Sequence, residues 1–450
     1  MNRKKKSAVS VRKKKVASKG KKSPRVSTVA PSDYTPELLR LCVQAKEASR
    51  VLAGTSVDQR NRALLAMAEA LEKNKVDILF RNEIDIEAGR RSGLSPALLD
   101  RLALTARRVT DMAQGLREVA ELPDPLAEIT DQWDRPSGLK VQKIRVPLGV
   151  IAMIYEARPN VTVDATGLCL KAGNAVVLRG GKEAVDSNTV LVRVLKDALA
   201  GVGLPASAVQ FVGTTDRSVI RDLVRMDRFI DLVIPRGGEE MVNAIREMAT
   251  VPVLSHGKGL CSVYVDKDAD LGMAERIAFN AKVQRPGVCN AMETLLVHRD
   301  LAGTFIPGMV RRFAENRVTV RGDAAVQLWG GAAVVPAKAD DFDMEFLDLE
   351  LAMRVVDSVE EAVAHINTHG SHHSDAIVTQ NEETARRFMS EVDSAAVFHN
   401  ASTRLHDGGA LGLGSEMGIS TQKLHARGSM GLRELTTTKY LVRGSGQIRE

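Results

Sequence analysis

The 450-residue chain lacks several features that would assign it directly to a class of protein. No uncharged apolar run approaches the roughly 20 residues that a membrane-spanning helix needs, and the most apolar stretch, residues 146–155, is much shorter. The four cysteines, Cys42, Cys169, Cys261 and Cys289, lie far apart and form no CxxC pair. We therefore expect no membrane span, no disulfide scaffold and no zinc ribbon, and the cysteine usage favours a reducing, cytoplasmic setting.

Short motifs that mark hydrolytic or metal chemistry are also missing. The nine histidines show no HExxH or other metal-ligand spacing, and the chain contains no GxSxG. His372 and His373 stand together between Gly370 and Ser374. This composition predicts a solvated polar loop, so we expect no metal site.

Positive charge is concentrated at one end of the chain. The net charge is +7, yet residues 1–30 hold twelve Lys or Arg and no Asp or Glu, which leaves 51 basic and 56 acidic residues elsewhere. We predict a disordered basic tail over residues 1–32, because this segment can bury too little apolar surface to fold. The tail could contact nucleic acid, ribosomes or an anionic membrane. A solvated extension is the favoured interpretation, since no aromatic side chain offers a stacking platform for bases.

Hydrophobic periodicity predicts an α/β protein. Residues 35–121 are helical in pattern, with Leu64, Met67, Ala68 and Leu71 on one face and a helix start at Ser95-Pro96. Alternation predicts a half-buried strand at 139–146. Buried strands and helical segments then alternate, which is typical of a doubly wound parallel sheet. The expected strands are 150–155, 175–178, 209–212 and 229–234, and the expected helices are 164–171 and 187–202.

Two of these strands end in glycine pairs flanked by cations. The residues are Arg179, Gly180, Gly181 and Lys182 after one strand, and Arg236, Gly237 and Gly238 after another. Glycine lets the backbone approach a phosphate, and nearby cations neutralise it. Neither turn matches GxGxxG or GxxxxGK(S/T), so each alone is equally well a tight turn with solvated charges. Their occurrence on two strand ends favours a nucleotide cofactor.

The cysteines differ in their surroundings. Cys42 and Cys169 have apolar neighbours, and Cys261 begins an expected strand over 261–265, so we expect three packed, inert thiols. Cys289 lies in a Pro-Gly turn close to Arg285 and just before an expected strand at 294–297. Such a thiol can be exposed and its thiolate favoured by the cation, which makes Cys289 a candidate nucleophile. From local context alone, an unreactive turn thiol is the favoured interpretation.

Five segments together identify a family resemblance. They are PLGVIAMIYEARPNVTVDA (147–165), VVLRGGKEAVDSN (176–188), DLVIPRGGEEMV (231–242), NAKVQRPGVCNAMETLLVH (280–298) and the stretch 392–428, which contains GLGSEMG and HARG. From about Thr35 onward, the chain resembles the gamma-glutamyl phosphate reductases of the aldehyde dehydrogenase superfamily. The resemblance implies a Rossmann-like NADP-binding domain at 33–128 and 146–255 and an α/β catalytic domain at 256–434. A small β oligomerisation element at 129–145 and 435–450 would make a homo-oligomer.

The resemblance also implies a reaction: NADPH reduces L-glutamate 5-phosphate to L-glutamate 5-semialdehyde and phosphate, the second step of proline biosynthesis. Cys289 matches the family nucleophile, and Asn160 matches the asparagine that stabilises the oxyanion. Arg179 to Lys182 match the adenosine-ribose segment, and Glu416 resembles the glutamate that holds the nicotinamide ribose. A separate glutamate 5-kinase would then supply the substrate, with functional coupling between the two enzymes.

The remaining assignments concern water and substrate. The stretch Leu254–Gly259 carries no carboxylate that could activate water, which favours a phosphate-releasing enzyme over a phosphate-independent aldehyde dehydrogenase. His256, within it, is either a proton carrier or a turn residue without a role. Arg158 and Arg285 could bind the substrate's anionic groups and Glu156 its ammonium, but each could equally form a structural ion pair. A nucleic-acid-binding protein on an inactive scaffold is the rival of another class, motivated by the tail alone.

Overall fold

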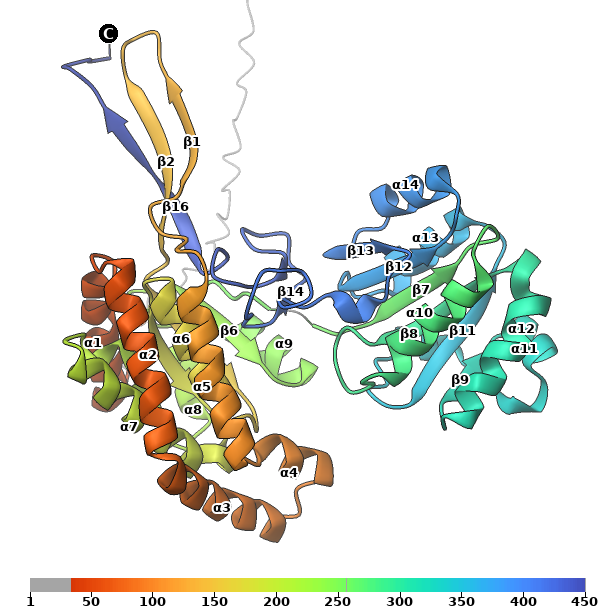
Figure 1. Cartoon of the computed structure of the whole chain (residues 1–450), viewed down its shortest axis with the longest axis horizontal. Coiled ribbons are helices and arrows are strands. Elements are labelled where there is room, and N and C mark those ends of the chain that lie inside the picture. The colour runs from red at the N-terminus through yellow and green to blue at the C-terminus, as the bar shows by residue number, and fades with distance from the viewer. Residues whose placement is uncertain (1–33, 256, 450) are drawn as a thin grey trace, which may run out of the picture.

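The computed structural model describes residues 34–255 and 257–449, which form two α/β units and a three-stranded sheet that projects from the first unit (Figure 1). The predicted basic tail, residues 1–32, lies outside the described residues, as does His256. In the described part of the chain, no helix is long and apolar enough to cross a membrane.

The N-terminal region is helical, as the periodicity predicted. Its helices are α1 (Pro36–Leu52), α2 (Val57–Lys73), α3 (Lys75–Arg91), α4 (Pro96–Leu102) and α5 (Ala106–Glu121). Helix α4 begins at the expected position, because the Ser95 side chain accepts a hydrogen bond from the backbone N–H of Leu98 and Pro96 occupies the first turn. Leu64, Met67, Ala68 and Leu71 are all fully buried on α2.

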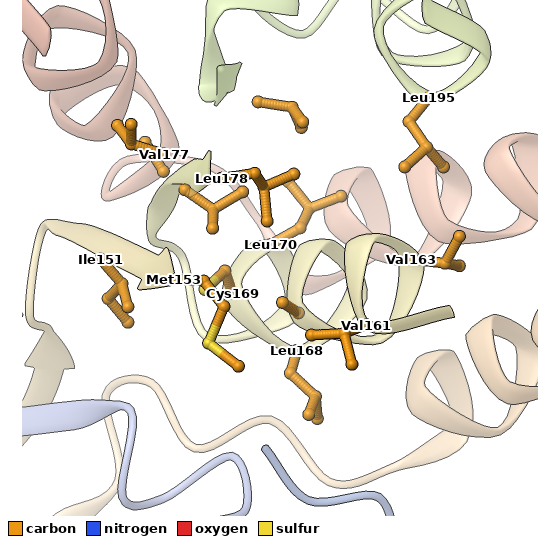
Figure 2. Packing of buried hydrophobic residues seen from close by; sticks show 14 of the residues in the cluster. Ile151, Met153, Val161, Val163, Leu168, Cys169, Leu170, Val177, Leu178 and Leu195 are labelled. Carbon is orange, nitrogen blue, oxygen red and sulfur yellow. The ribbon is translucent and has the colours of Figure 1, made fainter. Parts of the chain in front are cut away.

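A four-stranded parallel sheet forms the centre of the first unit, in the order β5-β4-β3-β6. The strands are β3 (Val150–Tyr155), β4 (Ala175–Arg179), β5 (Val209–Phe211) and β6 (Leu232–Arg236), and the helices between and after them are α6 (Asn160–Lys171), α7 (Val185–Gly201), α8 (Ser218–Leu223) and α9 (Glu239–Met248). Strand β3 is buried along its whole length. Figure 2 shows its Met153 close to Cys169 of α6, and both belong to the hydrophobic core of the first unit.

A seven-stranded parallel sheet forms the second unit, in the order β10-β9-β11-β8-β7-β12-β13. Its strands are β7 (Cys261–Val265), β8 (Met292–His298), β9 (Thr319–Gly322), β10 (Val334–Pro336), β11 (Glu350–Val356), β12 (Ser374–Val378) and β13 (Ala396–His399). Its helices are α10 (Leu271–Val283), α11 (Arg299–Glu315), α12 (Ala324–Gly330), α13 (Val359–His369) and α14 (Glu382–Glu391). The strands expected at 261–265 and 294–297 are confirmed as β7 and the centre of β8.

The projecting sheet joins segments far apart in the sequence. Strands β1 (Ile129–Asp134), β2 (Lys140–Pro147) and β16 (Thr436–Arg443) pair antiparallel in the order β1-β2-β16. Just before β16, the short strands β14 (Ile419–Ser420) and β15 (Gly428–Ser429) pair with each other. Met417, Met430 and Leu432 belong to the hydrophobic core of the first unit. The segment 417–432 therefore packs in the first unit, although the predicted catalytic domain extends to residue 434.

Candidate active site

Both glycine turns lie at one edge of the first sheet. Strand β3 pairs with β4 on one side and β6 on the other, and all three run parallel. The register places Ile154 beside Arg179 and Tyr155 beside Arg236. Since the carboxyl ends of parallel strands meet at the same edge, the two turns are brought together there, which is where doubly wound sheets bind ligands.

The turn after β4 is tightly packed. A Cβ at Gly180 would collide with the Asn188 side chain, and one at Gly181 would collide with the Glu183 carboxylate, so a larger residue at either position would displace these side chains. Glu183 in turn accepts a hydrogen bond from the backbone N–H of Ala157 (2.6 Å). Arg179 is buried, and its guanidinium donates to the Gly180 carbonyl, whereas Lys182 is exposed. Lys182 is therefore the cation of this turn that a ligand in solution can reach.

The turn after β6 holds Glu156. The Oε2 atom of Glu156 accepts a hydrogen bond from the backbone N–H of Gly238 (3.1 Å), and a Cβ at Gly237 would strike the Glu156 carboxylate. A Cβ at Gly418 would collide with the Arg236 guanidinium, so Arg236 lies against the segment that carries Glu416. These contacts place Glu156 at the glycine turn; it does not line the cavity shared by Arg158 and Arg285 described below.

The loop between α10 and β8 presents Cys289, and contacts on both of its sides hold it. The backbone of Cys289 lies so close to Gly259 that no Cβ would fit there. The Cys261 thiol donates to the Cys289 carbonyl (3.2 Å). On the other side, Asn290 donates through Nδ2 to the His406 carbonyl (3.1 Å) and accepts at its own carbonyl from Thr403 (2.8 Å). A framework of buried polar contacts thus fixes the loop, while Cys289 itself is partly exposed.

The protonation of Cys289 differs from the expectation based on its sequence neighbours. Burial raises the pKa of the Cys289 thiol above its ordinary value. The nearby Arg236 guanidinium acts in the opposite direction, while the carboxylates of Glu345 and Glu416 raise the pKa further. A nearby cation thus favours the thiolate, as expected, but burial and the two carboxylates outweigh it.

The other cysteines are buried, as predicted. Burial raises the pKa of Cys42 to about 12 and raises the pKa of Cys169 and Cys261. The expectation of a solvated loop was wrong for His373, which is fully buried with Nδ1 2.7 Å from the Ser374 hydroxyl. The loop folds inward because Ser374 starts β12 and also contacts His406 (2.7 Å), beneath the Cys289 loop. In the described chain, no cluster of side chains could hold a metal ion.

Asn160 is the first residue of α6 and is exposed toward a cavity of about 670 Å³. Its Nδ2 donates to Oδ2 of Asp164, one helical turn later (2.9 Å). Burial raises the pKa of Asp164 to about 6. Arg158, Arg285 and Val288 line the same cavity, so the structure brings Asn160 together with two predicted substrate arginines and with the neighbour of Cys289.

The two arginines are not structural ion-pair residues. In the described part of the chain, neither Arg158 nor Arg285 forms a salt bridge with a carboxylate, although the cavity contains both side chains. Burial lowers the pKa of Arg158 to about 10, and the positive charges of Arg236 and Arg101 lower it further. Asp100, Asp111 and Asp164 line the same cavity, and Asp100 is paired with Arg108. Arg101, Arg158 and Arg285 have no carboxylate partner among the described residues, so they are the cations of this space that can bind an anion.

A second, smaller cavity of about 320 Å³ lies beside Glu416. Glu118, Leu122, Asp407 and Gly408 share its lining. The Glu416 carboxylate accepts a hydrogen bond from the backbone N–H of Gly408 (3.0 Å), and burial raises its pKa. The Glu416 carboxylate also raises the pKa of the Cys289 thiol, so its charge acts on the predicted nucleophile.

Comparison with known proteins agrees with this geometry. The aldehyde dehydrogenase family model matches residues 19–343. The chain is 55% identical over 411 residues to a gamma-glutamyl phosphate reductase of Moorella thermoacetica, which covers 90% of this chain and 97% of the relative. A gamma-glutamyl phosphate reductase of Thermodesulfovibrio yellowstonii is 51% identical over 92% of this chain and 99% of its own length. The crystal structure of a gamma-glutamyl phosphate reductase from Thermotoga maritima superposes with a TM-score of 0.90 at 45% identity, over 92% of this chain and all of that one.

The chain belongs to the aldehyde dehydrogenase family and, within it, to the gamma-glutamyl phosphate reductases. The predicted aldehyde dehydrogenase-like fold is thereby confirmed, and membership implies a nicotinamide cofactor.

The edge of the first sheet fits such a cofactor. The side-chain amide nitrogen of Asn188 is buried directly behind Gly180 and has no hydrogen-bond partner within the described residues. The turn before it has no room for side chains at Gly180 and Gly181, which keeps its backbone open to a close approach. Exposed Lys182 adds a cation at the rim. Arg179, by contrast, is buried beneath the turn, so its charge can act on a ligand electrostatically but not by direct contact.

Sequence reasoning missed three residues near the reaction centre. Glu345 accepts a hydrogen bond from the Gly259 backbone N–H (2.9 Å), so a carboxylate does reach the 254–259 stretch, although none is present within it. Asp164 could have been found, because its spacing of four residues from Asn160 on a helix places both on one face. Arg101 lines the 670 Å³ cavity from α4, and no pattern in the sequence distinguishes it.

Proposed function

We propose that the chain catalyses the NADPH-dependent reduction of L-glutamate 5-phosphate to L-glutamate 5-semialdehyde and phosphate, the second step of proline biosynthesis from glutamate. The observation that carries the proposal is the cavity beside the Cys289 loop, where Asn160 and two arginines without carboxylate partners lie together. An acyl phosphate presents a carbonyl carbon for a thiolate and anionic groups for the arginines. This substrate therefore matches both the nucleophile and the arginines of the site.

Cys289 acts as the nucleophile. The Cys289 thiol loses its proton to solvent, its sulfur forms a bond to the acyl carbon, and the electron pair of the carbonyl moves onto oxygen. When that pair returns, the carbon–oxygen bond to phosphate breaks and a thioester remains on Cys289. Phosphate is a good leaving group, so the step requires no activated water. Arg158 and Arg285 offset the negative charge of the departing phosphate, since both line the cavity without a carboxylate of their own.

Asn160 stabilises the oxyanion. One N–H of its side-chain amide is committed to Asp164, which fixes the amide plane and leaves the second N–H for the oxygen that becomes negative. When bound, a nicotinamide cofactor would supply the hydride that reduces the thioester carbon. The oxygen of the resulting thiohemiacetal then re-forms the carbonyl as the carbon–sulfur bond breaks, and the thiolate takes up a proton from solvent.

We assign cofactor binding to residues 33–128 and 146–255 and the nucleophile to the catalytic domain predicted at 256–434, whose last residues, from Met417 onward, pack in the core of the first unit. The turns at 179–182 and 236–238 would hold the cofactor's phosphates and adenosine ribose, and Glu416 its nicotinamide ribose. Lys182 is the accessible cation at this edge, which supports a preference for the 2′-phosphate of NADPH. For Glu156, the hydrogen bond from Gly238 favours a role in shaping this edge over binding the substrate ammonium.

We further propose a homo-oligomer that assembles through the sheet of β1, β2 and β16, whose outer strands are largely exposed. The substrate is an acyl phosphate, so a glutamate 5-kinase must supply it, and functional coupling to that kinase and a cytoplasmic location stay predictions. Contact between the basic tail and nucleic acid also stays a prediction, and the built site argues against an inactive scaffold.

One experiment tests the proposed reaction in its reverse direction. Pyrroline-5-carboxylate, the cyclic form of the semialdehyde, is supplied with phosphate and NADP⁺ or NAD⁺, and formation of the reduced cofactor is recorded. We expect faster turnover with NADP⁺ and at least a thousandfold loss in Cys289→Ala, roughly the loss seen when a covalent nucleophile is removed. Absence of turnover in the folded wild-type protein would contradict the proposal.

A further inference from the structure

Helix α4 forms a rigid wall of the 670 Å³ cavity, and Arg101 extends from it. Leu102 is fully buried against Ile86 and Ala184. The side chain of Asn82, itself buried, donates to the Leu102 carbonyl (2.9 Å) and accepts from the backbone N–H of Leu104 (2.7 Å). The backbone on the C-terminal side of Arg101 is therefore fixed, although the Arg101 side chain is exposed and lines the cavity.

Arg101 and Arg108 both line this wall, but only Arg108 is neutralised. Arg108 donates to the Asp100 carboxylate (2.9 Å) and to the Ala103 carbonyl (2.7 Å), which ties the turn between α4 and α5. Arg101 forms no ion pair and no hydrogen bond with the other described residues. Arg108 is thus a structural cation, whereas the Arg101 guanidinium holds no other described residue in place.

Arg101 shares its space with the reaction centre. Its positive charge lowers the pKa of Arg158, so the two guanidinium groups act on the same region of the cavity. Arg158 immediately precedes Pro159 and Asn160 and also interacts electrostatically with Cys289. Keeping like charges together costs free energy in the empty protein. That cost is offset when an anionic ligand binds, so the arrangement points to a ligand with more than one anionic group.

The proposed substrate has its anionic groups at opposite ends of a short carbon chain. The phosphate leaves from the carbon that Cys289 attacks, so it belongs to the arginines next to Cys289 and Asn160. The α-carboxylate lies at the far end and needs a separate cation on another wall of the cavity. A planar guanidinium can bind a carboxylate through two parallel hydrogen bonds, which also fixes the substrate's orientation.

We propose that Arg101 binds the α-carboxylate of the substrate and thereby selects an amino-acid semialdehyde over aldehydes that lack this group. The proposal rests on the proposed function, since it assigns a subsite within that reaction. It makes α4 the element that determines substrate specificity, while the strand ends of the two sheets carry the cofactor edge and the nucleophile.

The test measures separate Michaelis constants in the reverse reaction for Arg101→Gln, Arg101→Lys and the wild type. For Arg101→Gln we expect the KM for pyrroline-5-carboxylate to rise roughly ten- to hundredfold, the loss of one charge-assisted hydrogen-bond pair. The KM values for phosphate and NADP⁺ should change by less than about twofold. Arg101→Lys keeps the charge but loses the planar fork, so its KM should lie between those of the wild type and Arg101→Gln.

Arg91→Gln is the matched control. Arg91 lies in the last turn of α3, is exposed, forms no ion pair with the other described residues and does not line the cavity, so its removal should leave all three constants unchanged. An unchanged KM for pyrroline-5-carboxylate in Arg101→Gln would overturn the proposal. A rise confined to the KM for phosphate would show that Arg101 binds phosphate and not the α-carboxylate. An equal rise in all three KM values, together with a lower melting temperature, would show that Arg101 has a structural role. Wild-type protein without phosphate-dependent turnover would reject the proposed function itself.

Discussion

At the residue scale, the reactivity of Cys289 results from opposing influences. Burial and the carboxylates of Glu345 and Glu416 favour the thiol, and Arg236 favours the thiolate. Glu345 accepts a hydrogen bond from the Gly259 backbone N–H, and Arg236 lies against the segment at Gly418. The sum of these influences raises the pKa of the Cys289 thiol above its ordinary value, which favours the thiol over the more reactive thiolate.

This balance predicts the pH dependence of alkylation. A raised pKa means that the thiolate, and with it the rate of reaction with iodoacetamide, keeps increasing above the ordinary pKa of a cysteine. Removing the cation in Arg236→Gln should raise the pKa further and slow alkylation at pH 8. Removing a carboxylate in Glu345→Gln should lower the pKa and accelerate it.

The measurement is the rate of Cys289 modification between pH 6 and 10, followed by mass spectrometry of the peptide that contains it. Cys42, Cys169 and Cys261 serve as internal controls, since all three are buried and should react only on unfolding. A rate that levels off below the ordinary cysteine pKa, or variants that shift in the opposite directions, would contradict this description of the site.

At the element scale, the hydrophobic patterns of the sequence predicted most helices and strands. Where the structure differs from the prediction, contacts between elements are the reason. The strand at 261–265 was predicted with its observed bounds, because it is a short β-branched run with a clear start. The strand expected from Phe229 begins only at Leu232, because Phe229 and Ile230 turn back to donate to the Met226 carbonyl. Cys289 and Asn160 were found through long motifs. Arg101 and the burial of His373 depend on which elements pack together, and local sequence does not contain that information.

The element that carries Cys289 depends on a buried ion pair. Lys282 at the end of α10 and Glu293 in β8 are both fully buried, with 2.7 Å between Nζ and Oε2. Glu293 also accepts a hydrogen bond from the Leu347 backbone N–H (3.3 Å), close to Glu345. The pair thus joins the two elements that flank the catalytic loop to the segment that contacts Gly259.

Removing one partner of this ion pair should lower the free energy of unfolding strongly, whereas replacing both partners by apolar residues should not. Lys282→Met leaves the Glu293 carboxylate buried without its partner, and we expect a loss of about 3–5 kcal/mol in the free energy of unfolding. The double variant Lys282→Met/Glu293→Leu removes both charges and should recover most of that loss. Urea denaturation of the three proteins measures the effect. A double variant no more stable than the single one would show that the ion pair is not the source of the stability.

At the scale of the whole molecule, the projecting sheet exposes apolar surface in a way that a monomer rarely does. Figure 1 shows β1, β2 and β16 extending away from the first unit. Trp133 and Tyr440 pack edge to face with ring centroids 6.1 Å apart, and Val442 on β16 is 56% exposed. Because β16 is also an edge strand with unpaired backbone groups, a second copy of the chain can cover both features.

We expect charge on this sheet to disrupt the assembly. Val442→Glu/Tyr440→Glu should reduce the mass measured by light scattering to that of a smaller species, because like charges would face one another across a symmetric interface. Val76→Glu is the control, since Val76 is 84% exposed on α3, away from the sheet. A wild-type protein that is monomeric at micromolar concentration would contradict the proposed assembly, and so would a double variant of unchanged mass.

The central claim is that the Cys289 thioester exchanges its acyl group with phosphate and not with water. Glu345 makes the claim open to test, because it places a carboxylate beside Gly259 that could serve as a base for water. The most direct measurement is the rate of NADPH formation from pyrroline-5-carboxylate and NADP⁺ as phosphate is titrated from zero. We expect no turnover without phosphate and saturable turnover with it. Turnover that is independent of phosphate would show that water accepts the acyl group, and would contradict the proposed phosphate-releasing reaction.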